Sequence, residues 1–151
     1  MTVSVQAEDF DVSAEVAKLT VGKTGIGGIA TFIGKVRGEA DGRQLQSMAL
    51  EHYPGMTESE LARIEAEATT RFNLSASCII HRVGTLLPGD NIVLVIACAP
   101  HRHGAIAACD FLMDFLKTDA PFWKKETTAD GAGSWVDARS SDDTARRRWS
   151  P

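Results

Sequence analysis

Two apolar runs, separated by a short turn, constrain the fold of this chain more than any other feature. SASCIIHRVG at 75–84 and NIVLVIACAP at 91–100 flank the turn sequence LLPGD. Runs of this length, bounded by Pro and Gly, are typical of buried strands. We therefore expect two core strands joined by a Pro-Gly-Asp connection, with Pro100 ending the second strand.

A segment with helical periodicity lies on each side of these two strands. Residues 101–118 carry an apolar stripe that predicts a helix: Ile106, Cys109, Leu112, Met113 and Leu116. A second helix is predicted over 57–72, where Thr57 and Glu60 match the T-x-x-E capping box. Leu61, Ile64, Ala68 and Phe72 continue that pattern at helical spacing.

The remaining segments predict shorter elements. We expect a strand at 2–8, a helix near 12–19, a strand within 26–37 and a strand in LQSMALEHY at 45–53. FWKKETT and SWVDA predict a late pair of strands around DGAGS. The order is mixed, without regular βαβ alternation, so the expected fold class is α+β.

Size and charge exclude several classes of protein. A chain of 151 residues predicts one domain, which we place at 1–138, followed by a polar tail at 139–151. The net charge of −4 disfavours non-specific nucleic-acid binding. No apolar run is long enough to span a membrane, and MTVSVQAEDF lacks the features of a signal peptide. A cytoplasmic location is therefore expected.

The three cysteines do not form a recognisable functional motif. Cys78 and Cys98 lie in the apolar runs, and Cys109 lies within the helical pattern, with no CxxC pair. We expect them to be buried structural residues.

Cationic side chains gather at three places despite the acidic net charge. Lys35 and Arg37 are two residues apart at a strand end and share one face if the strand continues. His101 and Arg102 stand where a strand meets a helix N-terminus, a position that favours anions. Each pair could equally consist of ordinary solvent-exposed polar residues without a role in binding. No Cys or carboxylate completes a recognisable set of metal ligands with the histidines.

The third place is KTDAPFWKKE at 117–126, where lysines flank an aromatic turn. Lys117 falls at a helix C-terminus, which suits the helix dipole and is by itself a sufficient structural reason for a lysine. Phe122 and Trp123 can anchor the turn in the core and so fix the position of Lys124. A lysine held beside apolar walls and other cations can take part in proton transfer.

These motifs together resemble the family of large, catalytic subunits of molybdopterin synthase. The resemblance covers about residues 26–149 and rests on several long motifs in the family's order: FIGKVRG, LEHYPGMTE, IIHRVGTLLPGD, HR at 101–102, FLMDFLKTDAPFWKKE and WVDAR. It implies an α/β-hammerhead type of fold with an additional small antiparallel β subdomain. It also implies a homodimer that binds two small ubiquitin-like subunits, giving a heterotetramer.

The resemblance further implies a reaction and its site. The family transfers sulfur from the thiocarboxylated C-terminal Gly of the small subunit to cyclic pyranopterin monophosphate, which forms the dithiolene of molybdopterin. No metal or other cofactor is implied for this step. Carried over by motif, the catalytic residues are Lys117 and Lys124. The substrate-binding residues are Lys35, Val36, Arg37, His101, Arg102, Lys125, Glu126 and Arg139.

Two rival functions stay open at this level. One is a sulfurtransferase that forms a persulfide on Cys78, Cys98 or Cys109, although the apolar setting of the first two argues against it. The other is a non-catalytic module that docks a ubiquitin-like tail or another anion.

The helix predicted after Pro100 raises a geometric conflict. It would separate His101 from Lys117 by about 24 Å, at ~1.5 Å per residue. One small pterin cannot easily contact both ends. We therefore predict a site shared by two chains, with His101 and Arg102 from one chain and Arg37, Lys117 and Lys124 from the other.

Overall fold

The computed structural model of this chain describes residues 2–136 and 140–150. Its elements follow in the order β1 (Thr2–Gln6), α1 (Val12–Thr20), β2 (Gly28–Lys35), β3 (Glu39–Ala40), β4 (Arg43–His52), α2 (Met56–Phe72), β5 (Ala76–Arg82), β6 (Gly84–Leu86), β7 (Asn91–Ala99), α3 (Arg102–Thr118), β8 (Phe122–Thr128), β9 (Gly133–Val136) and α4 (Ser140–Arg147). None of the described helices is long and apolar enough to cross a membrane.

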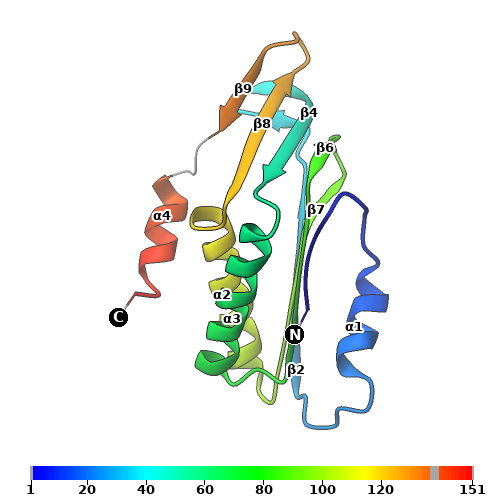
Figure 1. Cartoon of the computed structure of the whole chain (residues 1–151), viewed down its shortest axis with the longest axis vertical. Coiled ribbons are helices and arrows are strands. Elements are labelled where there is room, and N and C mark those ends of the chain that lie inside the picture. Colours follow the sequence, from blue (N-terminus) through cyan, green and yellow to red (C-terminus); the bar gives the residue numbers. More distant parts are fainter. Residues whose placement is uncertain (1, 137–139, 151) are drawn as a thin grey trace.

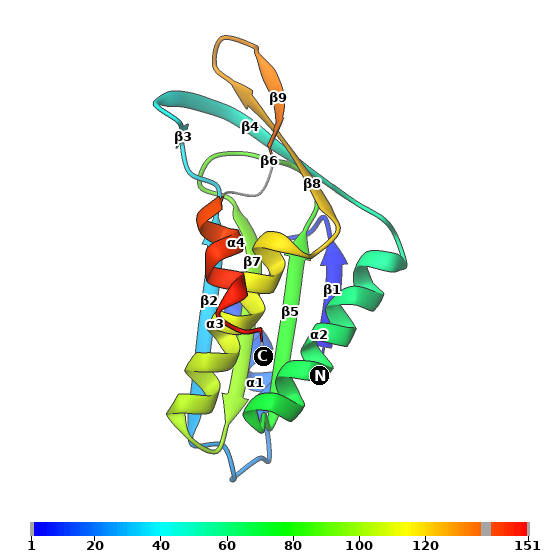
Figure 2. The same cartoon turned by 90° about the vertical axis from the view of Figure 1, so that its left-hand side faces the viewer.

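The main sheet has the strand order β1-β5-β7-β2. The two strands predicted from the apolar runs, β5 and β7, form its centre and pair antiparallel, with Ile79 opposite Val95. β1 joins β5 in parallel, and β2 lies at the other edge, antiparallel to β7. Helix α1 covers one face of this sheet, and α2 and α3 cover the other (Figures 1 and 2).

Alternate residues of β7 supply the two halves of the core. Val93 and Val95 pack towards α2 and α3, where Phe115 is also buried. Leu94 and Ile96 pack on the opposite face, under α1. Burial of each such side chain contributes about 1.5–3 kcal/mol. Because both faces are covered, β5 and β7 read as continuous apolar runs rather than alternating ones.

A second, smaller sheet stands at one end of the main sheet (Figures 1 and 2). It has the order β3-β4-β8-β9, with β6 also paired to β4, and all of its pairs are antiparallel. Leu45, Met48, Leu50, Val36 and Leu86 form its own small core. The α+β class and the additional antiparallel sheet are therefore confirmed, whereas the hammerhead designation stays a prediction.

Helix α2 occurs where predicted, but its cap is different. The N-cap is Gly55, and its N–H donates to the Glu58 carboxylate over 3.0 Å. Thr57 lies inside the first turn, is fully buried, and donates its hydroxyl proton to the carbonyl of Pro121. The capping box predicted at Thr57 and Glu60 is wrong, because Thr57 ties the helix to a distant segment instead.

The apolar stripe predicted for α3 is partly wrong. Ile106 is 60% exposed, whereas the small residues Ala105 and Ala108 face the core. Small side chains are needed there because this end of α3 approaches α2 closely. A Cβ atom at Gly104 would stand only 2.8 Å from the carbonyl oxygen of Phe72.

The C-terminal segment, predicted only as a polar tail, forms α4 and packs along α3 (Figure 2). Arg148 pairs with Asp110 and Asp114 over 2.6 and 2.9 Å. Trp149 donates its indole N–H to Asp114 over 2.6 Å and packs edge-on against Phe72 and Phe111. The domain boundary expected between 138 and 139 falls outside the described residues and stays a prediction.

Candidate active site

A cavity of about 860 Å³ lies where the small sheet meets the main sheet and the C-terminal end of α3. Its lining includes the end of β2, the inner face of β4 and β8, and the last turns of α3. The cavity therefore joins segments far apart in sequence, and residues of both sheets line it.

Four of the predicted cations line this cavity together. They are Lys35, Arg37, Lys117 and Lys124. Lys117 belongs to the last turn of α3, where a cation suits the helix dipole. Lys124 lies on β8, between Leu50 of β4 and Val136 of β9. The four positive charges make the cavity suited to anions.

The aromatic turn between the two lysines is anchored in the core by Phe122, as predicted, whereas the prediction for Trp123 is wrong because its side chain is 40% exposed. The ring of Phe122 stacks on His81 with centroids 3.9 Å apart. Trp123 packs edge-on against Tyr53 at 4.5 Å. The Thr57 hydroxyl holds the carbonyl of Pro121 at 3.1 Å. These contacts fix the start of β8, and with it the position of Lys124 relative to the end of α3.

Polar partners hold two of the four cations. Lys124 lies 3.8 Å from the carboxylate of Glu126, which also lines the cavity. Lys35 donates to the side-chain oxygen of Asn91 over 3.1 Å. The carboxylate of Asp142, at the start of α4, reaches the lining as well. Positive charge remains in excess, because the four cations of the lining outnumber its three carboxylates, Glu39, Glu126 and Asp142.

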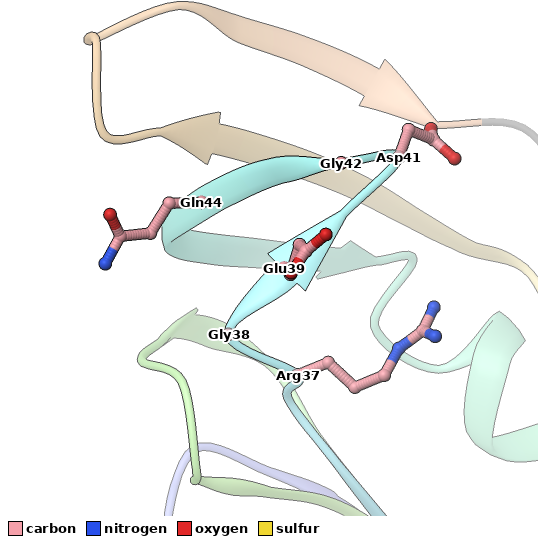
Figure 3. Close-up of a pocket in the computed structure, with 6 residues that line it drawn as sticks. All are labelled: Arg37, Gly38, Glu39, Asp41, Gly42 and Gln44. Atoms are coloured by element: carbon pink, nitrogen blue, oxygen red, sulfur yellow. The ribbon is translucent and has the colours of Figure 1, made fainter.

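A polar hollow adjoins the cavity at the β3–β4 hairpin (Figure 3). Arg37 and Glu39 belong to both. The hairpin turns at Asp41 and Gly42, which both have positive φ, at 51° and 78°. Figure 3 shows Arg37 extending beneath the hairpin while Gln44 points away on the other side. Arg37 therefore stands between the open hollow and the cavity.

The sequence analysis missed a buried polar residue of the cavity wall. His81, on β5, is 7% exposed and lines the cavity. Burial lowers the pKa of its imidazole to about 4, and the nearby charges of Lys117 and His52 act in the same direction. The one available signal was a titratable residue at the end of the apolar run SASCIIHRV.

Other predicted site residues lie away from the cavity. The side chain of Val36 is buried in the small core, and its backbone N–H and C=O bond to Asp90 and Gly89. Lys125 points to the opposite face of β8 from Lys124, with its ammonium 6.0 Å from the centre of the Trp135 ring. Neither residue belongs to the lining.

His101 and Arg102 are exposed at the N-terminal end of α3, the end remote from Lys117. This placement agrees with the separation expected from the sequence. Arg139 lies outside the described residues. The structure thus brings together Lys35, Arg37, Lys117, Lys124 and Glu126 within one chain.

The cysteines are buried, as expected. Burial raises the pKa of the Cys78 thiol to about 12 and that of Cys109 to about 11, and it also raises the pKa of Cys98. Within residues 2–136 and 140–150, no three His, Cys, Asp or Glu side chains group as a metal site.

Comparison with known proteins identifies the family. The family model described as MoaE protein matches residues 5–119. The chain belongs to the MoaE family. A relative from Rhizobium meliloti (strain 1021), named molybdopterin synthase catalytic subunit, is 54% identical over 150 residues, covering 99% of this chain and 96% of its own. The Pseudomonas aeruginosa relative of the same name is 49% identical and covers 99% of both chains.

Solved MoaE-family structures share the fold. The MoaE protein of Burkholderia ambifaria MC40-6 superposes with a TM-score of 0.84, at 53% identity, covering 99% of this chain and 98% of its own. The molybdopterin synthase structure from Staphylococcus aureus has a TM-score of 0.80 at 28% identity, covering 88% and 95%. The α+β arrangement described above is therefore that of the MoaE family.

Proposed function

We propose that this chain is the catalytic subunit of a molybdopterin synthase. It transfers sulfur from the C-terminal thiocarboxylate of a small ubiquitin-like subunit to cyclic pyranopterin monophosphate and so forms the dithiolene of molybdopterin. The observation that carries this proposal is the cavity in which Lys35, Arg37, Lys117 and Lys124 converge. A thiocarboxylate and a phosphate are both anions, so bringing them together requires such a cluster of cations. We also propose that the reaction takes place in the cytoplasm.

The two lysines have different roles in this proposal. Lys117, at the end of α3, meets the thiocarboxylate and stabilises the charge that moves during sulfur transfer. Lys124, on β8 beside Glu126, stabilises charge or moves a proton as the cyclic phosphate opens. Lys35 and Arg37 then bind the substrate from the end of β2, and Arg37 can form two parallel hydrogen bonds with a phosphate.

Reconstitution tests the proposed reaction. The purified chain, a thiocarboxylated small subunit and cyclic pyranopterin monophosphate should together yield a dithiolene-containing pterin. The same small subunit with an ordinary C-terminal carboxylate is the control and should yield none. Failure of the thiocarboxylated subunit to yield product, under conditions in which the Pseudomonas aeruginosa relative does, would contradict the proposal.

The position of His101 and Arg102 supports a site completed by a second copy of the chain. The start of β2 packs directly on the start of α3: a Cβ atom at Gly28 would stand 3.1 Å from the Cα atom of Arg102. The end of β2, at Lys35, lines the cavity. β2 therefore connects the two places that the substrate must contact.

β2 is also an edge strand, with Ile29, Phe32 and Ile33 exposed on it. An exposed apolar edge is a template for pairing with another strand. Antiparallel pairing of β2 with its own copy about a two-fold axis would exchange the two ends of the strand. Each cavity would then receive His101 and Arg102 of the partner chain.

Mixed dimers test the shared site. One inactive chain carries His101→Ala and Arg102→Ala, and the other carries Lys117→Ala. A shared site predicts that activity returns in the heterodimer, because one of its two sites is then fully wild type. If each site is built within one chain, both sites carry a defect and the mixture stays inactive.

A further inference from the structure

His81 occupies a position in the cavity wall that the proposed reaction has not used. It lies on β5 with its side chain on the face that carries Ile79, towards α3. The stack on Phe122, with ring planes 21° apart, fixes the orientation of the imidazole. A buried ring held in this way presents its nitrogen atoms in fixed directions.

The hydrogen bond of His81 defines its tautomer. Its Nδ1 lies 2.9 Å from the carbonyl oxygen of Arg82. A carbonyl can only accept, so Nδ1 carries the hydrogen. The imidazole is neutral near pH 7, since burial and the charges of Lys117 and His52 lower its pKa to about 4. Nε2 therefore keeps a free lone pair and can only accept a hydrogen bond.

Lys117 is the hydrogen-bond donor near His81 that has no carboxylate partner among the described residues. Among the described residues, no Asp or Glu forms an ion pair with it, whereas Lys124 has Glu126. Lys117 and His81 line the same cavity, and the charge of Lys117 acts on the imidazole. A lysine on a flexible four-carbon stem needs an acceptor to hold its ammonium in one place. A carboxylate would neutralise the charge that an incoming anion needs, whereas a neutral imidazole leaves that charge intact.

We propose that His81 is a positioning residue for Lys117: its Nε2 accepts a hydrogen bond from the Lys117 ammonium and holds that ammonium at the end of the cavity. The catalytic consequence rests on the proposed function, while the hydrogen bond itself does not. His81 does not remove a proton from Lys117, because so weak a base remains almost entirely unprotonated near neutral pH.

Nitrogen-15 NMR of the histidine rings tests the hydrogen bond without any substrate. The His81 resonances are assigned by their loss in His81→Phe. We expect Nδ1 to be protonated and Nε2 unprotonated throughout the neutral range. Lys117→Met should shift the Nε2 resonance of His81, while Lys125→Met, on the other face of β8, should leave it in place. An unchanged Nε2 resonance in Lys117→Met, or a protonated Nε2, would overturn the proposal.

Kinetics test the consequence for sulfur transfer. His81→Phe keeps a ring to stack on Phe122 but removes the acceptor, and should lower the single-turnover rate about tenfold or more. The KM for the pterin should change little, because Lys35 and Arg37 still bind it. His81→Gln restores an acceptor and should recover most of the rate.

His103→Gln is the matched control, because His103 is exposed beside the start of α3 and does not line the cavity. Its rate should equal that of the wild type. Equal rates for His81→Phe and His81→Gln would reject a role for the acceptor. If the Nε2 resonance shifts in Lys117→Met as expected while neither the wild type nor any variant makes product, the proposed function fails and the hydrogen bond stands.

Discussion

At the scale of single residues, Lys117 and Lys125 are two lysines with opposite surroundings. Lys117 lines the cavity, while Lys125 lies over Trp135 on the outer face of β8. Lys117→Ala should lower product formation about a hundredfold or more, since it removes a charge aimed at the reacting centre. Lys125→Ala should retain most activity. Single-turnover assays of both variants measure this, with circular dichroism to confirm folding. Comparable rates for the two variants would refute the assignment.

The buried thiols give a second prediction. Because burial raises the pKa of Cys78 and Cys109 to about 12 and about 11, almost no thiolate forms near neutral pH. Replacement of all three cysteines by Ala should lower stability but leave sulfur transfer largely intact. Thermal unfolding and the reconstituted assay measure the two effects separately. Loss of turnover in a folded single-cysteine variant would instead favour a persulfide mechanism.

The cations were predictable from the sequence in a way that His81 was not. Lys117 and Lys124 stand out because charged side chains flank an aromatic turn, which is a local pattern. The role of His81 depends on Phe122 and Lys117, which lie far along the chain and meet it only in the folded structure. Side-chain alternation could not reveal it either, because β5 is buried on both faces.

At the scale of elements, the contact between α2 and the main sheet contains a buried carboxyl group. Glu65 is 2% exposed and accepts a hydrogen bond from Ser77 of β5 over 2.7 Å. Burial raises the pKa of Glu65, so the folded state favours the protonated form. Protonated Glu65 contributes fully to the free energy of unfolding below the pKa that Glu65 has in the unfolded state. This contribution is lost as the pH rises through the higher pKa of the folded state.

Glu65→Gln should therefore become progressively more stable than the wild type as the pH rises. The glutamine keeps an acceptor for Ser77 and cannot ionise. Urea unfolding at about pH 4.5 and about pH 8 measures the difference. Glu67→Gln, on the exposed side of the same helix, is the control and should show little pH-dependent change. A stability difference that is constant with pH would contradict this prediction.

Element order was predictable because each segment carried its own periodicity, but element ends were not. Thr57 looked like a cap, yet its hydroxyl bonds to Pro121, 64 residues away. Helix α4 was missed because its polar sequence has no apolar stripe, and it is held instead by ion pairs such as Arg146 with Asp119 at 2.7 Å. Both errors arise where a distant contact, rather than local sequence, decides the structure.

At the scale of the whole molecule, pairing through β2 makes a specific prediction about register. A two-fold axis normal to the sheet leaves each side chain on its own face, so the residue at the axis meets its own copy. Pairing that places Gly28 of one chain opposite Val36 of the other, one residue past the end of β2, puts Phe32 at the axis. Cα atoms of such a pair lie about 4.5–5.5 Å apart, within reach of a disulfide.

Phe32→Cys should therefore form a disulfide-linked dimer under mild oxidation, detected by non-reducing electrophoresis. Val21→Cys, at an exposed site in the loop after α1, is the control and should stay unlinked. The native cysteines are buried and should not compete. A Phe32→Cys chain that is dimeric by light scattering but does not cross-link would place the interface elsewhere.

The close approach of backbones at the start of α3 has a consequence for how this chain tolerates mutation. Side chains at Gly27 and Gly104 would collide with the carbonyl oxygens of Pro100 and Phe72, at 2.0 and 2.8 Å. A saturation library selected only for cofactor production would therefore rank these glycines with the lysines of the cavity. Soluble yield separates the two groups: lysine variants should accumulate normally, while glycine variants should be depleted from the soluble pool before any chemistry is measured.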